Sequence, residues 1–443
     1  MNSVITVNSA NPMMETWNVK NKRLALCTTE GCKLAIQEAR KIIEGGQEDA
    51  FVLFDLSVIR SQFDRWNANL PRVSPWYAMK CNPDEMILRE IAKLGCGFDA
   101  ASIHEMELAL AQGISPEKIV FSNPCRQPSH IRFAASAGIE LLTIDNIEEL
   151  RKVKKLHPTA KLLLRVLGDD SLSKCKFNEK FGVDHEECTH IIKEAQVLGA
   201  ELVGVSFHVG SNCRSAQSFV GALENSRNTF DLLKAFGFQP KILDLGGGWP
   251  GSLVGEEEHD EIPFEEIAKE VREALDKLFP NEDEVSIIAE PGRYFAHSTA
   301  MAIVNVTSKR YIMKTSDDEE EVVEYDESDP TKISGFRYYV NDGVYGTFNN
   351  VICDHATHLE PTFILNAEGN IMMFDQDCPV YDCTVWGNTC DGLDRVCASV
   401  KLPNVPIGTW FVFKNMGAYT TSAASASFNG FPLVKKFYIN ATN

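Results

Sequence analysis

One lysine and two glycine-rich segments supply residue types that could hold a phosphorylated carbonyl compound. Lys80 ends the apolar run Trp76–Lys80 in Y-A-M-K-C-N. A lysine there is either an ordinary strand-end surface residue or an amine that forms a Schiff base with a carbonyl cofactor. The segments D-L-G-G-G-W (residues 244–249) and E-P-G-R (residues 290–293) each follow a later β-rich run. Their backbone N–H groups and one guanidinium could cradle a phosphate, the candidates being Gly247, Gly248, Gly292 and Arg293.

Three further residues suit the same chemistry. A carboxylate at Glu290 that faces the pyridine nitrogen of pyridoxal phosphate would keep that nitrogen protonated, which strengthens the ring as an electron sink. His208, in S-F-H-V-G-S, could stack on the ring face, with Ser211 reaching the phosphate. A single strand-end histidine is otherwise an ordinary hydrogen-bonded residue, so only the joint placement of these groups favours a pyridoxal site.

A third cluster lies in W-G-N-T-C-D-G-L-D, residues 386–394. Cys390 is either a cysteine buried in a turn or a proton donor to a substrate carbanion. Asp391 could bind a cationic substrate group, as could Asp354 in C-D-H-A.

Elements that could position these residues recur along the first 300 residues, as short β-rich runs with helical stretches between them. The runs are Trp76–Lys80, Cys96–Ala100, Ile119–Phe121, Glu140–Ile144, Lys161–Val166, Leu202–His208, Lys241–Leu245 and Val285–Glu290. Apolar residues at helical spacing mark Glu85–Lys93, Ser102–Gln112, Ile147–Leu156 and Ser215–Phe236. Eight strands that alternate with helices predict a parallel (β/α)8 barrel, although a doubly wound open sheet gives similar local signals.

The position of the polar residues favours the barrel. They sit at or just beyond the C-terminal ends of the expected strands, as Lys80, Asp99, Arg165, His208, Gly246 to Gly248 and Glu290. Barrel enzymes carry their chemistry at that end, and the loops after the seventh and eighth strands commonly bind phosphate. We therefore expect a TIM-like barrel over residues 51–298.

The pattern changes after about Ser298 to strand-like runs without long helices. These runs are Met301–Thr307, Gly335–Val340, Thr384–Trp386, Thr409–Lys414 and Pro432–Ile439. They predict a C-terminal β domain, a sandwich or barrel, over residues 299–443. Residues 1–50 hold a strand-like piece, Arg23–Cys27, and a helix, Leu34–Ile43, and we expect them to pack with the β domain.

Charge and composition exclude several classes of protein. The net charge of −19 argues against a nucleic-acid partner, which requires a basic footprint. Nine acidic residues between Asp317 and Asp329, without Lys or Arg, predict a solvated loop at about 316–331 or a mild steering field for a cationic substrate. No apolar run suits a membrane helix and the N-terminus lacks a secretion signal, so we expect a cytoplasmic protein. The thirteen cysteines, without C-x-x-C pairs, predict reduced thiols and no metal site.

Taken together, these motifs resemble the eukaryotic ornithine decarboxylases, group IV pyridoxal phosphate enzymes of the alanine racemase-like fold. The resemblance runs from about Phe51 to the C-terminus. It is carried by Y-A-M-K-C-N, F-D-A-A-S, S-N-P-C-R-Q, S-F-H-V-G-S, D-L-G-G-G-W-P-G, A-E-P-G-R-Y, Y-V-N-D-G-V-Y-G, W-G-N-T-C-D-G-L-D and N-M-G-A-Y-T.

The resemblance implies decarboxylation of L-ornithine to putrescine and CO2, the first step of polyamine biosynthesis, with pyridoxal 5′-phosphate as cofactor. Lys80 would bond to the cofactor and Cys390 would protonate the product. The implied cofactor-binding residues are Asp99, Glu105, Arg165, His208, Ser211, Gly247, Gly248, Glu290, Gly292, Arg293 and Tyr419. Those implied near the substrate are Tyr345, Cys353, Asp354 and Asp391. The family is homodimeric, with Cys390 and Asp391 reaching the opposite subunit's site, and antizyme is a candidate partner.

Three departures from the family pattern bear on substrate choice. Cys353 stands where Tyr is usual, Asn388 where Pro is usual and Ala100 where Cys is usual. The first could widen the substrate pocket, so a lysine or arginine decarboxylase stays open. A non-catalytic antizyme-inhibitor-like protein and a barrel that binds phosphate without the cofactor also stay open. A diaminopimelate decarboxylase is disfavoured because C-D-G-L-D replaces its C-E-S-G-D.

Overall fold

The computed structural model describes residues 5–7, 30–258, 260–280, 284–314, 320–323, 330–375 and 377–441. These residues form two compact units, one of residues 58–297 and one of residues 1–57 with 298–443. The expected strand Arg23–Cys27 lies outside the described residues.

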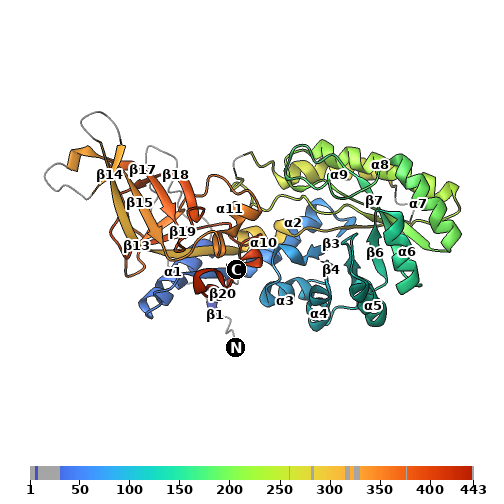
Figure 1. Ribbon diagram of the computed structural model, residues 1–443, viewed down its shortest axis with the longest axis horizontal. Helices are drawn as coiled ribbons and strands as arrows, with labels where there is room; N and C mark the ends of the chain where they lie inside the picture. The colour runs from blue at the N-terminus through green and yellow to red at the C-terminus, as the bar shows by residue number, and fades with distance from the viewer. Residues whose placement is uncertain are drawn as a thin grey trace. The chain divides into compact units, whose positions relative to one another are not determined.

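The first unit is a closed barrel of eight parallel strands, which confirms the predicted fold (Figure 1). The strands are β3 (Val73–Ala78), β4 (Gly97–Ala100), β5 (Ile119–Phe121), β6 (Leu141–Ile144), β7 (Lys161–Leu167), β9 (Glu201–His208), β11 (Ile242–Asp244) and β12 (Ser286–Ala289). Strands β4, β5 and β6 are buried along their whole length. Such strands read as continuous apolar runs because both faces of a barrel strand are covered.

Helices follow the strands and surround the barrel. They are α2 (Ser57–Asn69), α3 (Glu85–Lys93), α4 (Ile103–Ala111), α5 (Pro128–Ala137), α6 (Ile147–Leu156), α7 (His185–Leu198), α8 (Ala216–Ala235), α9 (Phe264–Leu278) and α10 (Arg293–Ala296). Several begin at a polar residue whose side chain accepts an N–H of the first turn, as Asp84, Ser102 and Asn146 do. A small two-stranded sheet, β8 (Ser173–Cys175) with β10 (Ser211–Cys213), was not predicted.

The second unit is built on a mixed sheet of ten strands. The strands are β1 (Ile5–Val7), β2 (Phe51–Asp55), β13 (Ala300–Lys314), β14 (Glu320–Val323), β15 (Ile333–Val340), β16 (Phe363–Leu365), β17 (Val380–Trp386), β18 (Arg395–Pro403), β19 (Trp410–Phe413) and β20 (Lys435–Ala441). The long strand β13 pairs with β2 and β19 along its first half and with β15 and β14 along its second, so it joins two parts of the sheet. Strand β14 falls within the segment predicted as an acidic loop, most of which lies outside the described residues.

The expected start of the barrel at residue 51 is wrong. Strand β2 pairs with β13 and β20 and therefore belongs to the sheet unit. The predicted helix Leu34–Ile43 is α1 (Glu30–Glu44), whose Ala35, Ile36 and Ala39 pack against Phe51 in one apolar cluster. The bound at residue 51 followed the start of the family resemblance, and no strand was predicted from the sequence at residues 51–55.

Candidate active site

Lys80 lies at the C-terminal end of the barrel strands, next to a buried acid. It is in the short helix η1 (Met79–Cys81), two residues past the end of β3, and not in the strand as predicted. Its Nζ is 2.5 Å from Oδ2 of Asp99 on β4. Asp99 is 1% exposed whereas Lys80 is 39% exposed. The lysine amine is therefore held by a buried carboxylate while part of its side chain stays accessible to solvent.

Asp99 is held in turn by its surroundings. The Ser122 hydroxyl donates a hydrogen bond to its other oxygen. Glu105, on α4, accepts the Ala101 N–H at 2.6 Å. Burial raises the pKa of Glu105, and the charge of Asp99 raises it further. Glu105 therefore fixes the turn after β4, a supporting place that fits its expected role.

The glycine-rich turn after β11 is shaped so that larger residues do not fit. Gly248 has φ +108°, and a Cβ there would lie 2.7 Å from the Gly210 carbonyl oxygen. A Cβ on Gly247 would lie 2.7 Å from Nε2 of His208. Glycine at both positions lets the backbone approach a ligand closely and leaves N–H groups at the barrel mouth.

Arg293, the first residue of α10, adds a fixed cation to this end of the barrel. Its Nη2 donates to Oγ of Ser211 at 3.0 Å, and both side chains are buried. The preceding Gly292 packs against the turn that carries Lys80, because an added Cβ would lie 2.8 Å from the Cys81 Cβ. The cation, the serine hydroxyl and the glycine turn form a site whose donors suit a phosphate.

Two buried carboxyl groups face each other at the ends of neighbouring strands. Asp244 ends β11 and Glu290 follows β12, and their side chains share a hydrogen bond. Burial raises the pKa of Asp244 to about 7 and, with the charge of Asp244, raises the pKa of Glu290 well above 4.5. The pair therefore holds a proton at neutral pH. Asp244 was missed as a site residue, although its place at a strand end in the glycine motif was a usable signal.

Arg165 and His208 lie on the adjacent strands β7 and β9. Burial lowers the pKa of His208 well below 6.5, and the charges of Arg165 and Lys80 lower it further. The ring is thus neutral. Its Nδ1 accepts the Gly210 N–H at 3.0 Å, which leaves the proton on Nε2 and fixes the ring plane. A neutral, fixed imidazole suits contact with a flat ring.

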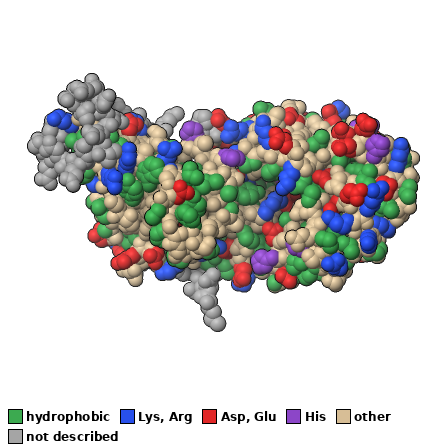
Figure 2. All heavy atoms as spheres, in the orientation of Figure 1, with side chains coloured by type: hydrophobic (Ala, Val, Ile, Leu, Met, Phe, Trp, Pro, Cys, Tyr) green, Lys and Arg blue, Asp and Glu red, His purple; other side chains and the backbone are tan. Residues whose placement is uncertain are grey.

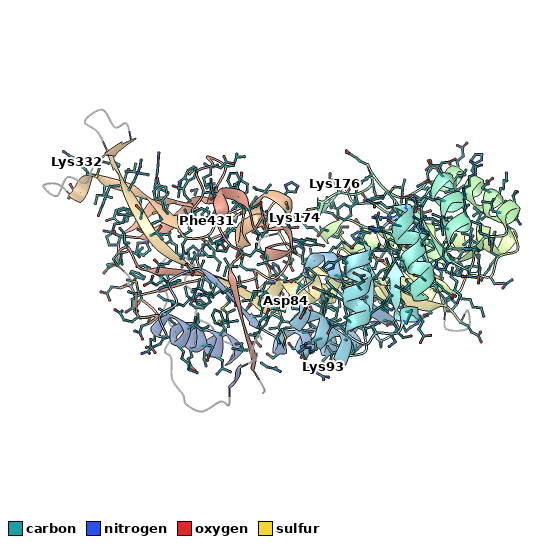
Figure 3. The ribbon with its side chains drawn as sticks, turned by 60° about the horizontal axis from the view of Figure 1, so that its bottom comes forward. Asp84, Lys93, Lys174, Lys176, Lys332 and Phe431 are labelled. Atoms are coloured by element: carbon teal, nitrogen blue, oxygen red, sulfur yellow. The ribbon has the colours of Figure 1, made fainter. Side chains whose placement is uncertain are left out.

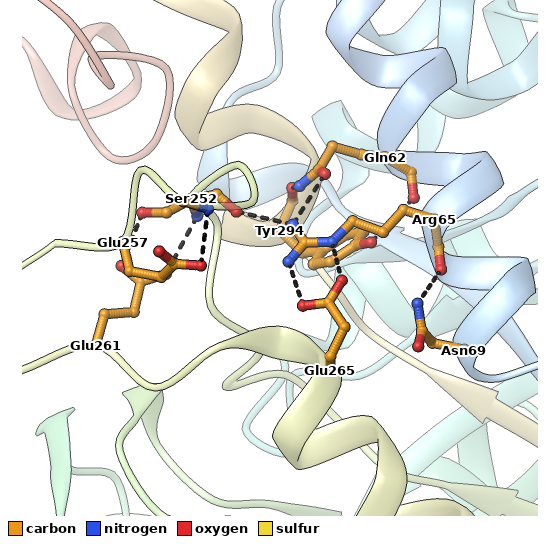
Figure 4. A network of polar contacts seen from close by, with 9 residues as sticks. Gln62, Arg65, Asn69, Ser252, Glu257, Glu261, Glu265 and Tyr294 are labelled. Atoms are coloured by element: carbon orange, nitrogen blue, oxygen red, sulfur yellow. Dashed lines mark hydrogen bonds and ion pairs between the residues drawn. The ribbon is translucent and has the colours of Figure 1, made fainter.

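The loop after the glycine turn is fastened by a network that sequence reasoning missed (Figure 4). Arg65, on α2, makes two bonds of 2.7 Å to Glu265 and donates to the Ser252 carbonyl at 2.8 Å. Ser252 donates its N–H and hydroxyl to Glu261, at 3.1 and 2.9 Å. Arg65 and its two partners are far apart in the sequence, and no local pattern marks such a contact.

The sheet unit carries the remaining candidates. The Tyr345 hydroxyl donates a hydrogen bond to the Asp391 carboxylate, which lowers the pKa of Asp391. Cys390 is exposed, which excludes the alternative of a cysteine buried in a turn of this unit. Tyr419 has φ +54°. Cys353 and Asp354 lie in another segment, at the end of the short helix α11 (Asn350–Cys353). Cys353 is exposed and Asp354 is buried.

Other features of the described residues bear on the predicted classes. Among them, no group of three or more His, Cys, Asp or Glu could hold a metal, and no helix is long and apolar enough to cross a membrane. Acidic and basic side chains are interspersed over the visible face of the barrel unit (Figure 2). Cys32 is disulfide-bonded, so the prediction of reduced thiols throughout is wrong at that residue, while eleven other cysteines are free.

Comparison with known families supports the assignment. A family model described as pyridoxal-dependent decarboxylase, pyridoxal binding domain, matches residues 56–297. A second, described as pyridoxal-dependent decarboxylase, C-terminal sheet domain, matches residues 294–417. The first match coincides with the barrel unit to within two residues, and the second lies within or next to the C-terminal part of the sheet unit.

Similar proteins and structures carry related names. Ornithine decarboxylase of Mus musculus is 41% identical over 406 residues, 91% of this chain and 83% of the mouse protein. Antizyme inhibitor 2 of Xenopus laevis is 42% identical over 383 residues, 86% and 79% of the two chains. The arginine decarboxylase of Paramecium bursaria Chlorella virus superposes with a TM-score of 0.80 at 29% identity, covering 91% of this chain and all of that one. The lysine/ornithine decarboxylase of Vibrio vulnificus gives 0.75 at 25% identity, covering 91% and 98%. The chain therefore belongs to the pyridoxal phosphate-dependent amino-acid decarboxylases.

Proposed function

We propose that the protein decarboxylates L-ornithine to putrescine and CO2, the first step of polyamine synthesis, in the cytoplasm. The main support is the arrangement at the C-terminal end of the barrel strands. There Lys80, ion-paired with the buried Asp99, lies at the same end as the glycine turn and Arg293. The mouse relative's name favours ornithine over other amino acids. The acids Asp354 and Asp391 suit the ammonium group at the far end of a short diamino acid.

Each barrel residue has a place in holding the cofactor. Pyridoxal phosphate, when bound, accepts the electron pair that the departing carboxyl group leaves behind. Lys80 would hold it through its carbonyl carbon, and Glu290 would interact with its pyridine nitrogen. Ser211, Gly247, Gly248, Gly292 and Arg293 would bind its phosphate, and Tyr419, from the sheet unit, would also bind the cofactor. His208 would contact the ring, while Asp99, Glu105 and Arg165 would support Lys80 and the ring.

The proposed proton donor to the product, Cys390, belongs to the sheet unit. The Cys390 thiol would donate a proton to the carbon that has lost CO2, and water would reprotonate the thiol afterwards. Asp391 and Asp354 bind the substrate's distal ammonium, with Tyr345 fixing the Asp391 carboxylate through its hydroxyl. Cys353 lies next to Asp354 and sets the space available to the substrate chain.

Turnover assays test this assignment. Release of CO2 is measured with ornithine, lysine and arginine, and ornithine should give the highest kcat/KM. Lys80→Ala should abolish both turnover and the visible absorbance of lysine-bound pyridoxal. An unaltered absorbance in this variant would contradict the assignment of Lys80, and a preference for lysine or arginine would contradict the substrate.

We further propose a homodimer in which Cys390 and Asp391 of one copy serve the barrel of the other. Lys80→Ala and Cys390→Ala should each be inactive alone. After mixing and subunit exchange, half the dimers are hybrids with one site doubly defective and one intact, so about a quarter of wild-type activity should return. No recovery despite proven exchange would show that each copy builds its site alone.

An antizyme-inhibitor-like binding protein is the second candidate, favoured by the 42% identity to antizyme inhibitor 2. Both Lys80 and Cys390 are present in this chain, which favours an enzyme. Antizyme binding is compatible with either function. A purified protein that binds antizyme and releases no CO2 from any of the three amino acids would support the inhibitor.

A further inference from the structure

A short exposed segment, Ser425–Gly430, contacts two loops of the sheet unit that carry candidate site residues, the loop of Tyr345 and the loop of Cys390. The Ser425 N–H donates to the Tyr345 carbonyl at 2.8 Å. The Phe428 ring stacks on the Tyr345 ring, with centroids 4.2 Å apart and planes at 24°. Oδ1 of Asn429 accepts the N–H of Cys390 at 3.0 Å. The segment therefore touches the main chain of the thiol residue and the ring that fixes Asp391.

The same two loops are tied together from inside by Asp394, which is 1% exposed. Its carboxylate accepts the Val344 N–H at 2.8 Å, the Thr389 N–H at 2.9 Å and the Thr389 hydroxyl at 2.6 Å. Thr389 is thus fixed to the interior. The next amide, that of Cys390, points to the exposed side and is taken by Asn429. Asp394 therefore binds the Thr389 amide from the buried side, and Asn429 binds the neighbouring Cys390 amide from the exposed side.

We propose that Asn429 is a positioning residue for Cys390. The inference rests on the proposed role of Cys390 as proton donor. The Cys390 thiol is on an exposed turn, so its position depends on how firmly the main chain of Cys390 is held. The hydrogen bond from the Cys390 N–H to Asn429 holds that main chain directly. Asn429 has φ +53° and ψ +12°, a left-handed conformation that asparagine and glycine accept more readily than other residues. In this conformation its Oδ1 accepts the Cys390 N–H.

The conformation of Asn429 allows two matched variants. Asn429→Gly keeps the left-handed backbone and removes the acceptor, while Asn429→Asp keeps an acceptor at the same atom. The surroundings are exposed, with Phe428 37% and Phe431 39% exposed, so neither change disturbs the apolar core. Figure 3 labels Phe431 in the sheet unit. Asn366→Gly is the control, because it removes an amide oxygen that accepts N–H bonds in another turn of the same unit.

The experiment uses the full-length holoenzyme and measures kcat, KM and the amine formed per CO2 released with ornithine. A displaced thiol leaves the electron pair of the broken bond to be protonated at another atom, so the amine yield per CO2 should fall. One hydrogen bond corresponds to roughly a two- to tenfold loss in kcat. We expect this loss in Asn429→Gly with little change in KM, recovery in Asn429→Asp, and wild-type values in Asn366→Gly.

Two outcomes overturn the inference and are separable from failure of the proposed function. If Asn429→Gly keeps wild-type kcat and amine yield while Cys390→Ala loses both, Cys390 is the donor and Asn429 does not position it. If Asn429→Asp is as impaired as Asn429→Gly, the effect does not come from the acceptor. If Cys390→Ala itself keeps wild-type amine yield, the proposed proton donor is wrong and the inference falls with it.

Discussion

Replacing Asp244 by asparagine should change how stability depends on pH. Asp244 is 1% exposed and shares a hydrogen bond with Glu290, and burial raises its pKa from 3.8 to about 7. The asparagine side chain has nearly the same shape as the aspartate that it replaces. Its oxygen can still accept the Gly246 N–H, which Asp244 accepts at 2.9 Å, and its amide N–H can donate to Glu290. The variant therefore keeps the contacts and removes one titration.

The sign follows from the raised pKa. Below pH 4 the carboxyl is protonated in both the folded and the unfolded chain. Between pH 4 and pH 7 the unfolded chain releases this proton first, so stability falls as pH rises and stays lower above pH 7. The full shift corresponds to on the order of 4 kcal/mol, of which about 2 kcal/mol is lost between pH 5 and pH 7. For a unit of this size that is roughly 5–10 °C in Tm.

Thermal unfolding of cofactor-free protein, followed by circular dichroism at pH 5, 6, 7 and 8, tests the reasoning. The difference in Tm between Asp244→Asn and wild type should increase with pH, by roughly 5–10 °C between pH 5 and pH 7. Asp276→Asn is the control, since that side chain is 63% exposed and should show no such trend. A Tm difference that is flat from pH 5 to pH 8 would refute the protonated pair and assign Asp244 an ordinary ionised state.

Two further changes probe the substrate and cofactor sites. Cys353→Tyr should raise the ratio of kcat/KM for ornithine over lysine, because a larger side chain next to Asp354 leaves less room for an extra methylene, usually a discrimination of about 1–3 kcal/mol. Steady-state assays with both substrates measure the ratio, and no change would mean that this residue does not set substrate length. Gly248→Ala should weaken cofactor binding roughly tenfold or more, since φ is +108° and the Cβ would lie 2.7 Å from the Gly210 carbonyl oxygen. A fluorescence titration that gives wild-type affinity would contradict this.

The barrel could be predicted because its strands are short, apolar and regularly spaced. Seven of the eight predicted runs contain a strand of the barrel or all but one residue of it, and the run Trp76–Lys80 overlaps the second half of β3. Lys80 was placed within a strand since Met79 and Cys81 are apolar and buried, as in a strand, although the chain turns there. The apolar pattern reports burial and does not separate an extended residue from a tight turn. Strand β2 was not predicted, and the boundary at residue 51 followed the start of the family resemblance.

The candidate site residues also fall into two classes, those at strand ends and those in contacts between loops. Residues at strand ends, such as Asp99, His208 and Glu290, could be predicted because the fold brings all such ends together. Contacts made by loops could not. The pairing of Asn429 with Cys390 joins residues 39 apart through one side-chain oxygen, and neither residue type is unusual in a turn. Such contacts depend on the path of the chain in three dimensions.

The charges around the barrel mouth explain why a protonated acid pair lies there. Asp99 already balances Lys80, so a fully ionised Asp244 and Glu290 would leave Arg165 as the main cation near two buried negative charges. Holding one proton between the two acids removes that imbalance. In the proposed site, the shared proton would be available to the pyridine nitrogen of the cofactor, and Glu290 would stay next to that nitrogen as a carboxylate. Asp244 would then no longer share this proton. Cofactor affinity in wild type should therefore depend on pH near 7, and that dependence should shift in Asp244→Asn, because the amide has no proton to exchange with Glu290.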